Sequence, residues 1–310
     1  MSKIQEEPVI RPYISGQTPL KQKLTSPTVI GAILQENDLH FAKQFGQNFL
    51  IDENIVTKIA EASDVGPEDT VLEVGPGLGT LTRELAARAG QVYTVEIDKK
   101  LIPVLMGTLS DLPNVGLINA DILKLDFRKL LADEKSVKIA ANLPYYITTP
   151  VIMGFLESDI PFSRMTFLVQ KEVGERLCAV PGTKAYGALS IAAQYYADIE
   201  PEFNVPAGVF MPKPKVDSVV ISLTKKTVEG PEHKTDKKLF LKLVKAGFAN
   251  RRKTLINSLS QNSGYPKETL LQALDAAEIS PGIRAEKLTA ADFARLTDAV
   301  INLEQAGRQQ

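Results

Sequence analysis

Short apolar runs alternate with amphipathic segments through the middle of the chain. Each run has the length of a buried strand, and the segments between several of them place apolar residues at helical spacing. The predicted strands are 70–74, 92–97, 115–119, 137–141 and 165–169, and the predicted helices are 80–89, 100–109 and 149–157. Buried strands joined by helices are typical of a mostly parallel sheet with helices on both faces. The pattern therefore predicts an α/β fold.

Weaker patterns flank this alternation on its N-terminal side. Residues 1–39 contain four scattered prolines and predict an extended or partly disordered lead-in with a short helix at 28–36. Residues 52–62 predict a further helix, for which Asp52 is the expected N-cap. The pattern tightens from Phe41, and the main domain is predicted to begin at residue 40.

On the C-terminal side the pattern becomes helical. A strand at 219–223 follows a proline-rich loop instead of a helix, so we expect it to pair antiparallel at the end of the sheet. The polar stretch 227–236 contains Gly230 and Pro231 and predicts a linker. Beyond it, amphipathic patterns predict a small all-helical domain. The predicted division is therefore 1–39, 40–226 and 227–310.

Composition narrows the class of protein. The chain has 310 residues, of which 44% are hydrophobic and 24% charged, as in ordinary globular proteins. One cysteine and two histidines exclude a disulfide framework and leave too few ligands for a metal site. Neither a membrane-spanning run of ~20 apolar residues nor a signal peptide is evident, so we expect a cytoplasmic protein without a membrane partner.

The net charge of −1 conceals a strong asymmetry. Residues 211–253 contain twelve Lys or Arg and four Asp or Glu, a local charge of +8, and the rest of the chain therefore carries −9. A basic cluster of this size suits a phosphate backbone, although a solvated helix face has the same composition. Within it, Arg251, Arg252 and Lys253 are the candidate RNA-binding residues.

Polar or glycine residues follow four successive predicted strands. The first strand runs into Gly75-Pro76-Gly77-Leu78-Gly79, and the later strands end near Glu96, Asp121 and Asn142. The carboxyl ends of parallel strands meet at one crevice. Glycine permits close approach of a ligand, Glu96 can accept from ribose hydroxyls, and Asp121 can accept from an adenine amino group. S-adenosylmethionine (SAM) fits this set, and NAD remains a competitor.

The segment Asn142-Leu143-Pro144-Tyr145 favours SAM and methyl transfer to adenine. The amino group of adenine is a poor nucleophile, because its lone pair is delocalised into the ring. The Asn142 side-chain oxygen and the Leu143 carbonyl can accept its two hydrogens and orient the lone pair. Pro144 stiffens the turn, and Tyr145 offers an aromatic face for the base. The glycine spacing also differs from the G-x-G-x-x-G of nicotinamide dehydrogenases.

The chain resembles the ribosomal RNA adenine N6-dimethyltransferase family, and within it the bacterial KsgA type. The motifs that carry the resemblance occur in the family's order from about residue 41 to the C-terminus: FGQNFLID, EVGPGLGTLT, VEID, NLPYYITTP, QKEV, KAYGALS, AQYY, FMPKPKVDS and GFANRRKTL. The resemblance implies a Rossmann-like, SAM-dependent methyltransferase sheet with a C-terminal helical domain. Residues 1–39 lie largely outside it.

The resemblance also assigns roles to individual residues. It implies cofactor contacts by Asn48, Leu50, Gly75, Glu96, Asp121 and Asn142. It implies that Phe210 of the FMPKPKVDS loop stacks on the target adenine opposite Tyr145, although a buried structural Phe is the alternative. No metal is implied, and a monomer is expected.

The implied substrate is a pair of adjacent adenosines in a hairpin near the 3′ end of 16S rRNA, dimethylated within the small ribosomal subunit or its precursor. Two alternatives stay open. The same scaffold serves as a non-catalytic ribosome-assembly or RNA-binding factor, and related enzymes methylate adenine in large-subunit rRNA. The motifs from Lys184 onward look more like the small-subunit enzyme.

Overall fold

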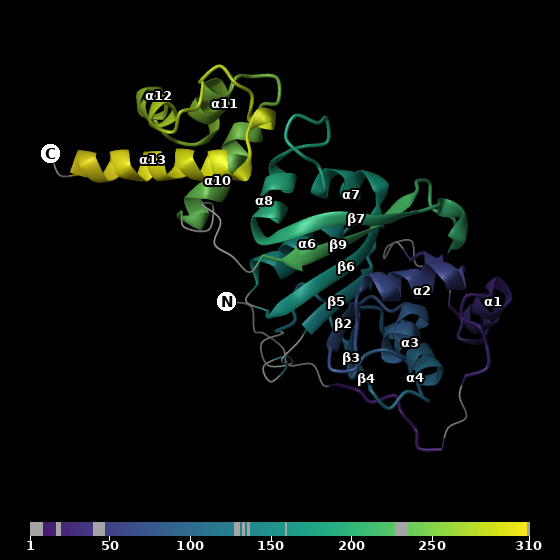
Figure 1. Ribbon diagram of the computed structural model, residues 1–310. Coiled ribbons are helices and arrows are strands. Elements are labelled where there is room, and N and C mark those ends of the chain that lie inside the picture. Colours follow the sequence, from purple (N-terminus) through teal and green to yellow (C-terminus); the bar gives the residue numbers. More distant parts are fainter. Residues whose placement is uncertain are drawn as a thin grey trace. The chain divides into compact units, whose positions relative to one another are not determined.

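The computed structural model describes residues 9–16, 20–39, 47–126, 131, 134, 137–158, 160–226 and 235–308 (Figure 1). It divides the chain into two compact units, residues 1–174 with 200–225 and residues 175–199 with 226–310. Most of the predicted linker, 227–234, lies outside the described residues. No helix in the described part of the chain is long and apolar enough to cross a bilayer.

The first unit holds the predicted α/β alternation. Its elements are α1 (Pro27–Glu36), β1 (Phe49–Leu50), α2 (Glu53–Ala62), β2 (Thr70–Val74), α3 (Thr80–Ala86), β3 (Gln91–Glu96), the 3-10 turn η2 (Lys99–Leu101), α4 (Ile102–Thr108), β4 (Val115–Asn119), β5 (Val137–Asn142), α6 (Thr148–Glu157), β6 (Phe162–Gln170), η3 (Ala207–Val209), β8 (Phe210–Met211) and β9 (Ser218–Lys225). Two elements cross the boundary between the units, α7 (Lys171–Leu177) and β7 (Ala197–Val205). The predicted strands and helices of this region are therefore confirmed to within a few residues.

Seven strands form the main sheet in the order β4-β3-β2-β5-β6-β9-β7. The strands from β4 to β6 are parallel, and β9 pairs antiparallel with β6, as the sequence predicts. β9 is not at the end of the sheet, however, because β7 lies beyond it. The chain builds outward from β2 through β3 to β4 and then returns to β5 on the other side of β2. The switch point of the sheet therefore lies between β2 and β5.

Alternate residues of the strands face opposite layers of helices. Val71, Val92 and Leu168 share one buried cluster with leucines of α3 and α4, including Leu85 and Leu105. On the other face, Phe155 of α6 stacks on Phe167, the neighbour of Leu168 in β6, with ring centroids 6.4 Å apart. Both faces of the sheet are thus covered, which explains why the strands read as nearly continuous apolar runs.

The described part of the N-terminal lead-in is ordered against the sheet. Ile10 forms a backbone bridge with Leu117 of β4, the strand at the edge of the sheet. Further along, the Leu20 N–H donates to the Asp111 carboxylate at 3.1 Å, and buried residues of α1 join the same core as α2 and α3. The predicted helix at 28–36 is confirmed, whereas the extended lead-in before it covers a sheet edge.

The second unit is helical. Its elements are α8 (Ala188–Tyr196), α10 (Lys237–Phe248), α11 (Leu255–Asn262), α12 (Lys267–Ala276), η4 (Ala285–Lys287) and α13 (Ala290–Arg308). Aliphatic and aromatic side chains fill its core, against which Phe248 packs: it contacts Tyr186 and Phe293, with ring centroids 5.9 and 6.1 Å apart. Residues 175–199 pack in this unit, whereas the predicted division includes them in 40–226.

Candidate active site

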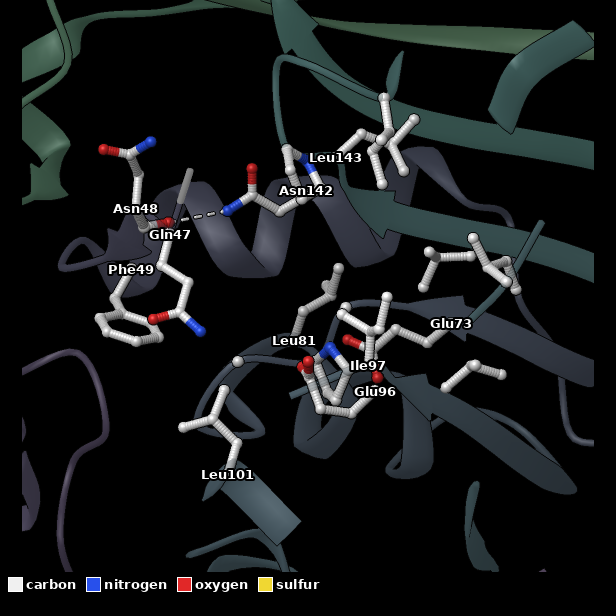
Figure 2. A pocket seen from close by; sticks show the side chains of 18 of the residues that line it. Gln47, Asn48, Phe49, Glu73, Leu81, Glu96, Ile97, Leu101, Asn142 and Leu143 are labelled. Atoms are coloured by element: carbon white, nitrogen blue, oxygen red, sulfur yellow. Dashed lines mark hydrogen bonds between the residues drawn. The ribbon is translucent and has the colours of Figure 1, made fainter. Parts of the chain in front are cut away.

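A cavity of about 220 Å³ opens at the carboxyl ends of the parallel strands (Figure 2). β2 and β5 are parallel neighbours in the sheet, with Val74 as the register partner of Ala141. The residues that follow these two strands therefore face the cavity from the two sides of the switch point. This is the place where open α/β sheets bind their ligands. Nine of the predicted site residues line the cavity: Asn48, Leu50, Gly75, Glu96, Asp121, Asn142, Leu143, Pro144 and Tyr145.

The glycine turn after β2 forms one wall of the cavity. Gly75 has a φ of 68°, and a Cβ placed on it would meet no atom within 4 Å. Gly79 also has a positive φ, but a Cβ there would lie 2.8 Å from Leu109 Cδ2. Gly75 therefore keeps open space on the cavity side, whereas Gly79 is required for packing. The first glycine fits the predicted close approach of a ligand to the backbone.

Glu96 ends β3 inside the cavity. It is only 5% exposed, and burial raises the pKa of its carboxyl to about 7. One of its oxygens accepts from the Asp98 N–H at 2.8 Å. The other carboxylate of the predicted pair, Asp121, is half-buried, forms an ion pair with Lys124 at 3.0 Å and lines the same cavity. Two acidic side chains at neighbouring strand ends are thus available to hydroxyl and amino donors.

Glu73 is a site residue that the sequence analysis did not single out. It lies in β2, is 1% exposed and lines the cavity close to Glu96 (Figure 2). Burial raises the pKa of its carboxyl to about 7, and the Thr82 hydroxyl donates to it at 2.6 Å. The sequence does contain a signal for this residue, because Glu73 is the one charged residue in the apolar run 70–74. Strongly perturbed acids in a cleft are frequent at functional sites.

Asn142 ends β5 opposite the glycine turn. Its side-chain amide nitrogen donates to the main-chain carbonyl of Asn48 at 3.1 Å (Figure 2). Behind it, the Leu143 N–H donates to the Leu168 carbonyl of β6, and the Pro144 carbonyl accepts from Ile147 and from the Thr148 hydroxyl. The turn is therefore fixed from both sides.

Two tyrosines follow this turn and differ in their surroundings. Tyr145 is half-buried, and its hydroxyl lies 3.1 Å from the Ser218 hydroxyl. Tyr146 is largely exposed at the rim of the cavity. The part of it that is buried, together with the charges of Asp121 and Glu96, raises the pKa of its hydroxyl. Tyr146 was not singled out in the sequence either.

Phe210 does not line the cavity, although it pairs with a residue that does. The short strands β1 and β8 pair Phe210 with Leu50, and the Phe210 ring is 3% exposed within the core of the first unit. It does not line the cavity that holds Tyr145. Its position supports the alternative of a structural Phe, and its stacking on a target base stays a prediction.

The three basic candidates belong to the second unit. All are exposed. A guanidinium nitrogen of Arg251 donates to the Lys184 carbonyl at 2.6 Å, and the Lys253 ammonium donates to the Gln261 side chain at 2.8 Å. Arg251 and Lys253 therefore have intramolecular partners, and RNA contact by Arg251, Arg252 and Lys253 stays a prediction.

The residues around the cavity fit SAM. The open space above Gly75 accommodates a ligand next to the backbone, and Glu96 and Asp121 supply acceptors for a ribose and an amino group. Apolar side chains such as Ile97, Ile122 and Leu123 complete the lining. Among the described residues, no cluster of His, Cys, Asp and Glu is arranged to hold a metal ion.

Comparison with protein families decides the class. The family model for ribosomal RNA adenine dimethylase matches residues 38–302. The chain belongs to this family. It is therefore an rRNA adenine dimethyltransferase that uses SAM, as the sequence predicts, and the Rossmann-like fold with C-terminal helices is confirmed. Family membership also excludes the nicotinamide dehydrogenase alternative.

Individual relatives agree with the family. "Ribosomal RNA small subunit methyltransferase A" of Ligilactobacillus salivarius is 49% identical over 288 residues, which cover 91% of this chain and 97% of the relative. The protein of the same name from Alkaliphilus metalliredigens is 47% identical, with 90% and 98% covered.

Two solved structures are similar over most of the chain. A dimethyladenosine transferase from Plasmodium falciparum has a TM-score of 0.71 at 26% identity, with 84% of this chain and 98% of that chain covered. The 23S rRNA methyltransferase ErmE has a TM-score of 0.64 at 28% identity, with 82% and 99% covered.

Proposed function

We propose that this chain dimethylates the N6 amino groups of two adjacent adenosines in a hairpin near the 3′ end of 16S rRNA. The observation that carries the proposal is the identity of 47–49% over nine-tenths of the chain to proteins named small subunit methyltransferase A. The substrate is the rRNA within the small ribosomal subunit or its precursor, and the site of action is the cytoplasm. The chain acts as a monomer.

The residues of the cavity support a defined division of labour. Asn48, Leu50, Gly75, Glu96 and Asp121 hold the cofactor, and Glu73 lies beside Glu96 at the same wall. SAM supplies an electrophilic methyl group when bound. The residues of the Asn142 turn then hold the adenine amino group: the Asn142 side-chain oxygen and the Leu143 carbonyl accept its two hydrogens, and Tyr145 stacks on the ring.

Orientation is the main catalytic contribution of this turn. Accepting both hydrogens directs the amino lone pair out of the plane of conjugation and toward the methyl group. A fixed geometry of this kind replaces a bimolecular encounter with a near-attack arrangement. The proton leaves easily once the nitrogen is methylated, so no general base is required. The basic residues Arg251, Arg252 and Lys253 contact the RNA backbone.

Methyl transfer to ribosomal subunits tests this function. Wild-type protein is incubated with methyl-labelled SAM and small subunits from cells that lack the modification, and nucleosides are separated after digestion. N6,N6-dimethyladenosine in the small-subunit rRNA is the expected result, and large subunits serve as the matched control. Label only in large subunits favours the large-subunit alternative, and label in neither overturns the enzymatic proposal.

A further inference from the structure

The hydroxyl groups of Tyr145 and Ser218 lie 3.1 Å apart, although the two residues are 73 positions apart in the sequence. Tyr145 lines the cavity from the turn after β5, and Ser218 is the first residue of β9. Ser218 is fully buried and does not itself line the cavity. It contacts the cavity only through the tyrosine.

Ser218 is presented by a rigid part of the sheet. β9 pairs with β6 along its length, and Ser218 itself is the register partner of Gln170. The preceding residue, Asp217, is anchored twice: its carbonyl accepts from the Lys171 N–H at 3.0 Å, and its carboxylate accepts from the Ala207 N–H at 2.9 Å. The backbone that carries Ser218 is therefore held by hydrogen bonds to β6 and at the preceding residue.

Tyr145 lies in the turn between β5 and α6, is half-buried and lines the cavity. A tyrosine has two rotatable side-chain bonds, and a hydrogen bond at its hydroxyl restricts the first of them and so fixes where the ring lies. Burial raises the pKa of the Tyr145 hydroxyl, which stays protonated at all working pH values.

We propose that Ser218 is a positioning residue for methyl transfer, because its hydrogen bond fixes the position of the Tyr145 ring on which the target adenine stacks. The inference rests on the proposed function, in which Tyr145 contacts the base. Loss of a single neutral hydrogen bond of this kind changes a rate by about three- to tenfold. The effect is expected on the RNA substrate and not on the cofactor, because β9, which carries Ser218, lies on the other side of β5 from β2 and its glycine turn.

A double-mutant cycle tests this coupling. The variants are Ser218→Ala, Tyr145→Phe and the double variant, all in the full chain and assayed on unmodified small subunits with saturating SAM. Each single variant is expected to lower kcat/KM for the subunit about three- to tenfold and to leave the Kd for SAM unchanged. The double variant is expected to fall no further than the single ones, because both remove the same bond.

Ser222→Ala is the matched control. Ser222 lies in the same strand, is also buried and is the register partner of Thr166, far from the cavity lining. This variant is expected to keep the wild-type kcat/KM. A comparable loss of kcat/KM in Ser222→Ala shows a general effect of serine removal from β9 and overturns the inference.

Three further outcomes overturn the inference. Losses that multiply in the double variant show that the two hydroxyl groups act separately. A fully active Tyr145→Phe shows that the hydrogen bond is not needed. Because this variant leaves Ser218 unchanged, it tests the inference even if Ser218→Ala fails to fold. A wild type that transfers no methyl group overturns the proposed function and the inference together, whereas the first two outcomes with an active wild type overturn the inference alone.

Discussion

The side-chain amide of Asn142 donates a hydrogen bond to the main-chain carbonyl of Asn48 across 3.1 Å. This contact fixes the orientation of the amide group, because its nitrogen is directed at Asn48. Asn48 precedes β1, and its neighbours Gln47, Phe49 and Leu50 line the same cavity. The contact therefore joins the turn proposed to orient the base to the segment proposed to hold the cofactor.

Substitution of Asn142 is expected to impair the reaction more than cofactor binding. Asn142→Ala removes the acceptor for the adenine amino group, and loss of one preorganised hydrogen bond at a reacting centre costs about 10²–10³ in rate. Single-turnover methylation of small subunits measures the rate, and calorimetry measures the Kd for SAM. Asn262→Ala is the control, since Asn262 also donates to a backbone carbonyl but lies in α11. A full rate in Asn142→Ala contradicts the assignment.

The buried carboxyl of Glu73 is expected to make stability depend on pH. Its pKa is raised from 4.5 to about 7, so between these values the folded protein holds a proton that the unfolded chain has lost. The free energy of unfolding therefore falls as the pH rises from 4.5 to 7, by about 3 kcal/mol for a shift of this size. Glu96 acts in the same direction in the protein without cofactor.

Glu73→Gln isolates the contribution of the Glu73 carboxyl to the pH dependence of stability. The amide keeps an acceptor for the Thr82 hydroxyl but carries no charge, so the variant is expected to be more stable than wild type at pH 8 and nearly equal to it at pH 4. Urea unfolding at a series of pH values measures the difference. Glu61→Gln, at an exposed position of α2, is the control. A variant that is equally or less stable at pH 8 contradicts the buried-carboxyl interpretation.

Substitution of the two outer glycines of the turn after β2 is expected to cause different losses, one in SAM affinity and the other in stability. Gly75→Ala places a methyl group in the cavity and strains a positive φ by about 1–2 kcal/mol, so its main loss is in SAM affinity, at least tenfold. Gly79→Ala drives a methyl group against Leu109 and is expected to cost roughly 2–4 kcal/mol of stability. Thermal melts and SAM titrations separate the two losses.

Gly107→Ala is the matched control for both glycines. Gly107 lies in α4, and a Cβ there meets no atom within 4 Å. Helix propensity makes this change neutral or slightly stabilising. If Gly75→Ala binds SAM with the wild-type Kd, the ligand does not use the open space at Gly75.

The core of the sheet was predictable because its strands are buried on both faces. Runs such as 70–74 and 137–141 contain few polar residues, and the features that follow them mark the carboxyl ends. β7 was missed for the opposite reason: Glu200, Pro201, Glu202 and Asn204 give this edge strand the composition of a loop.

The missed parts of the site depend on contacts between distant segments. The two-residue strands β1 and β8 have no sequence period, yet their pairing buries Phe210 against Leu50. The hydrogen bond between Tyr145 and Ser218 joins the turn after β5 to β9. In the sheet, β6 lies between these two strands. Pattern and motif locate the cofactor residues, whereas tertiary packing decides which aromatic ring reaches the cavity.

The ion pair between Arg83 and Asp111 is expected to anchor the N-terminal segment. Two guanidinium nitrogens of Arg83 donate to the two Asp111 oxygens at 2.6 and 2.8 Å, and Asp111 also accepts from the Leu20 N–H. These hydrogen bonds lower the Asp111 pKa from 3.8 to about 2. The folded state thus binds fewer protons, and this contribution of about 2 kcal/mol is present above pH 4 and lost as the pH falls toward 2.

Asp111→Asn removes the charge but keeps the size of the side chain. We expect it to cost about 1–3 kcal/mol at pH 7, because Arg83 is left partly buried without its counterion. We also expect faster hydrogen exchange of the backbone around Ile10, Ile14 and Leu20, which this edge of the sheet holds. Glu53→Gln is the control, because its ion pair with Lys23 is exposed and contributes little. Equal stability losses in the two variants, or unchanged exchange in Asp111→Asn, show that the ion pair does not anchor the N-terminal segment.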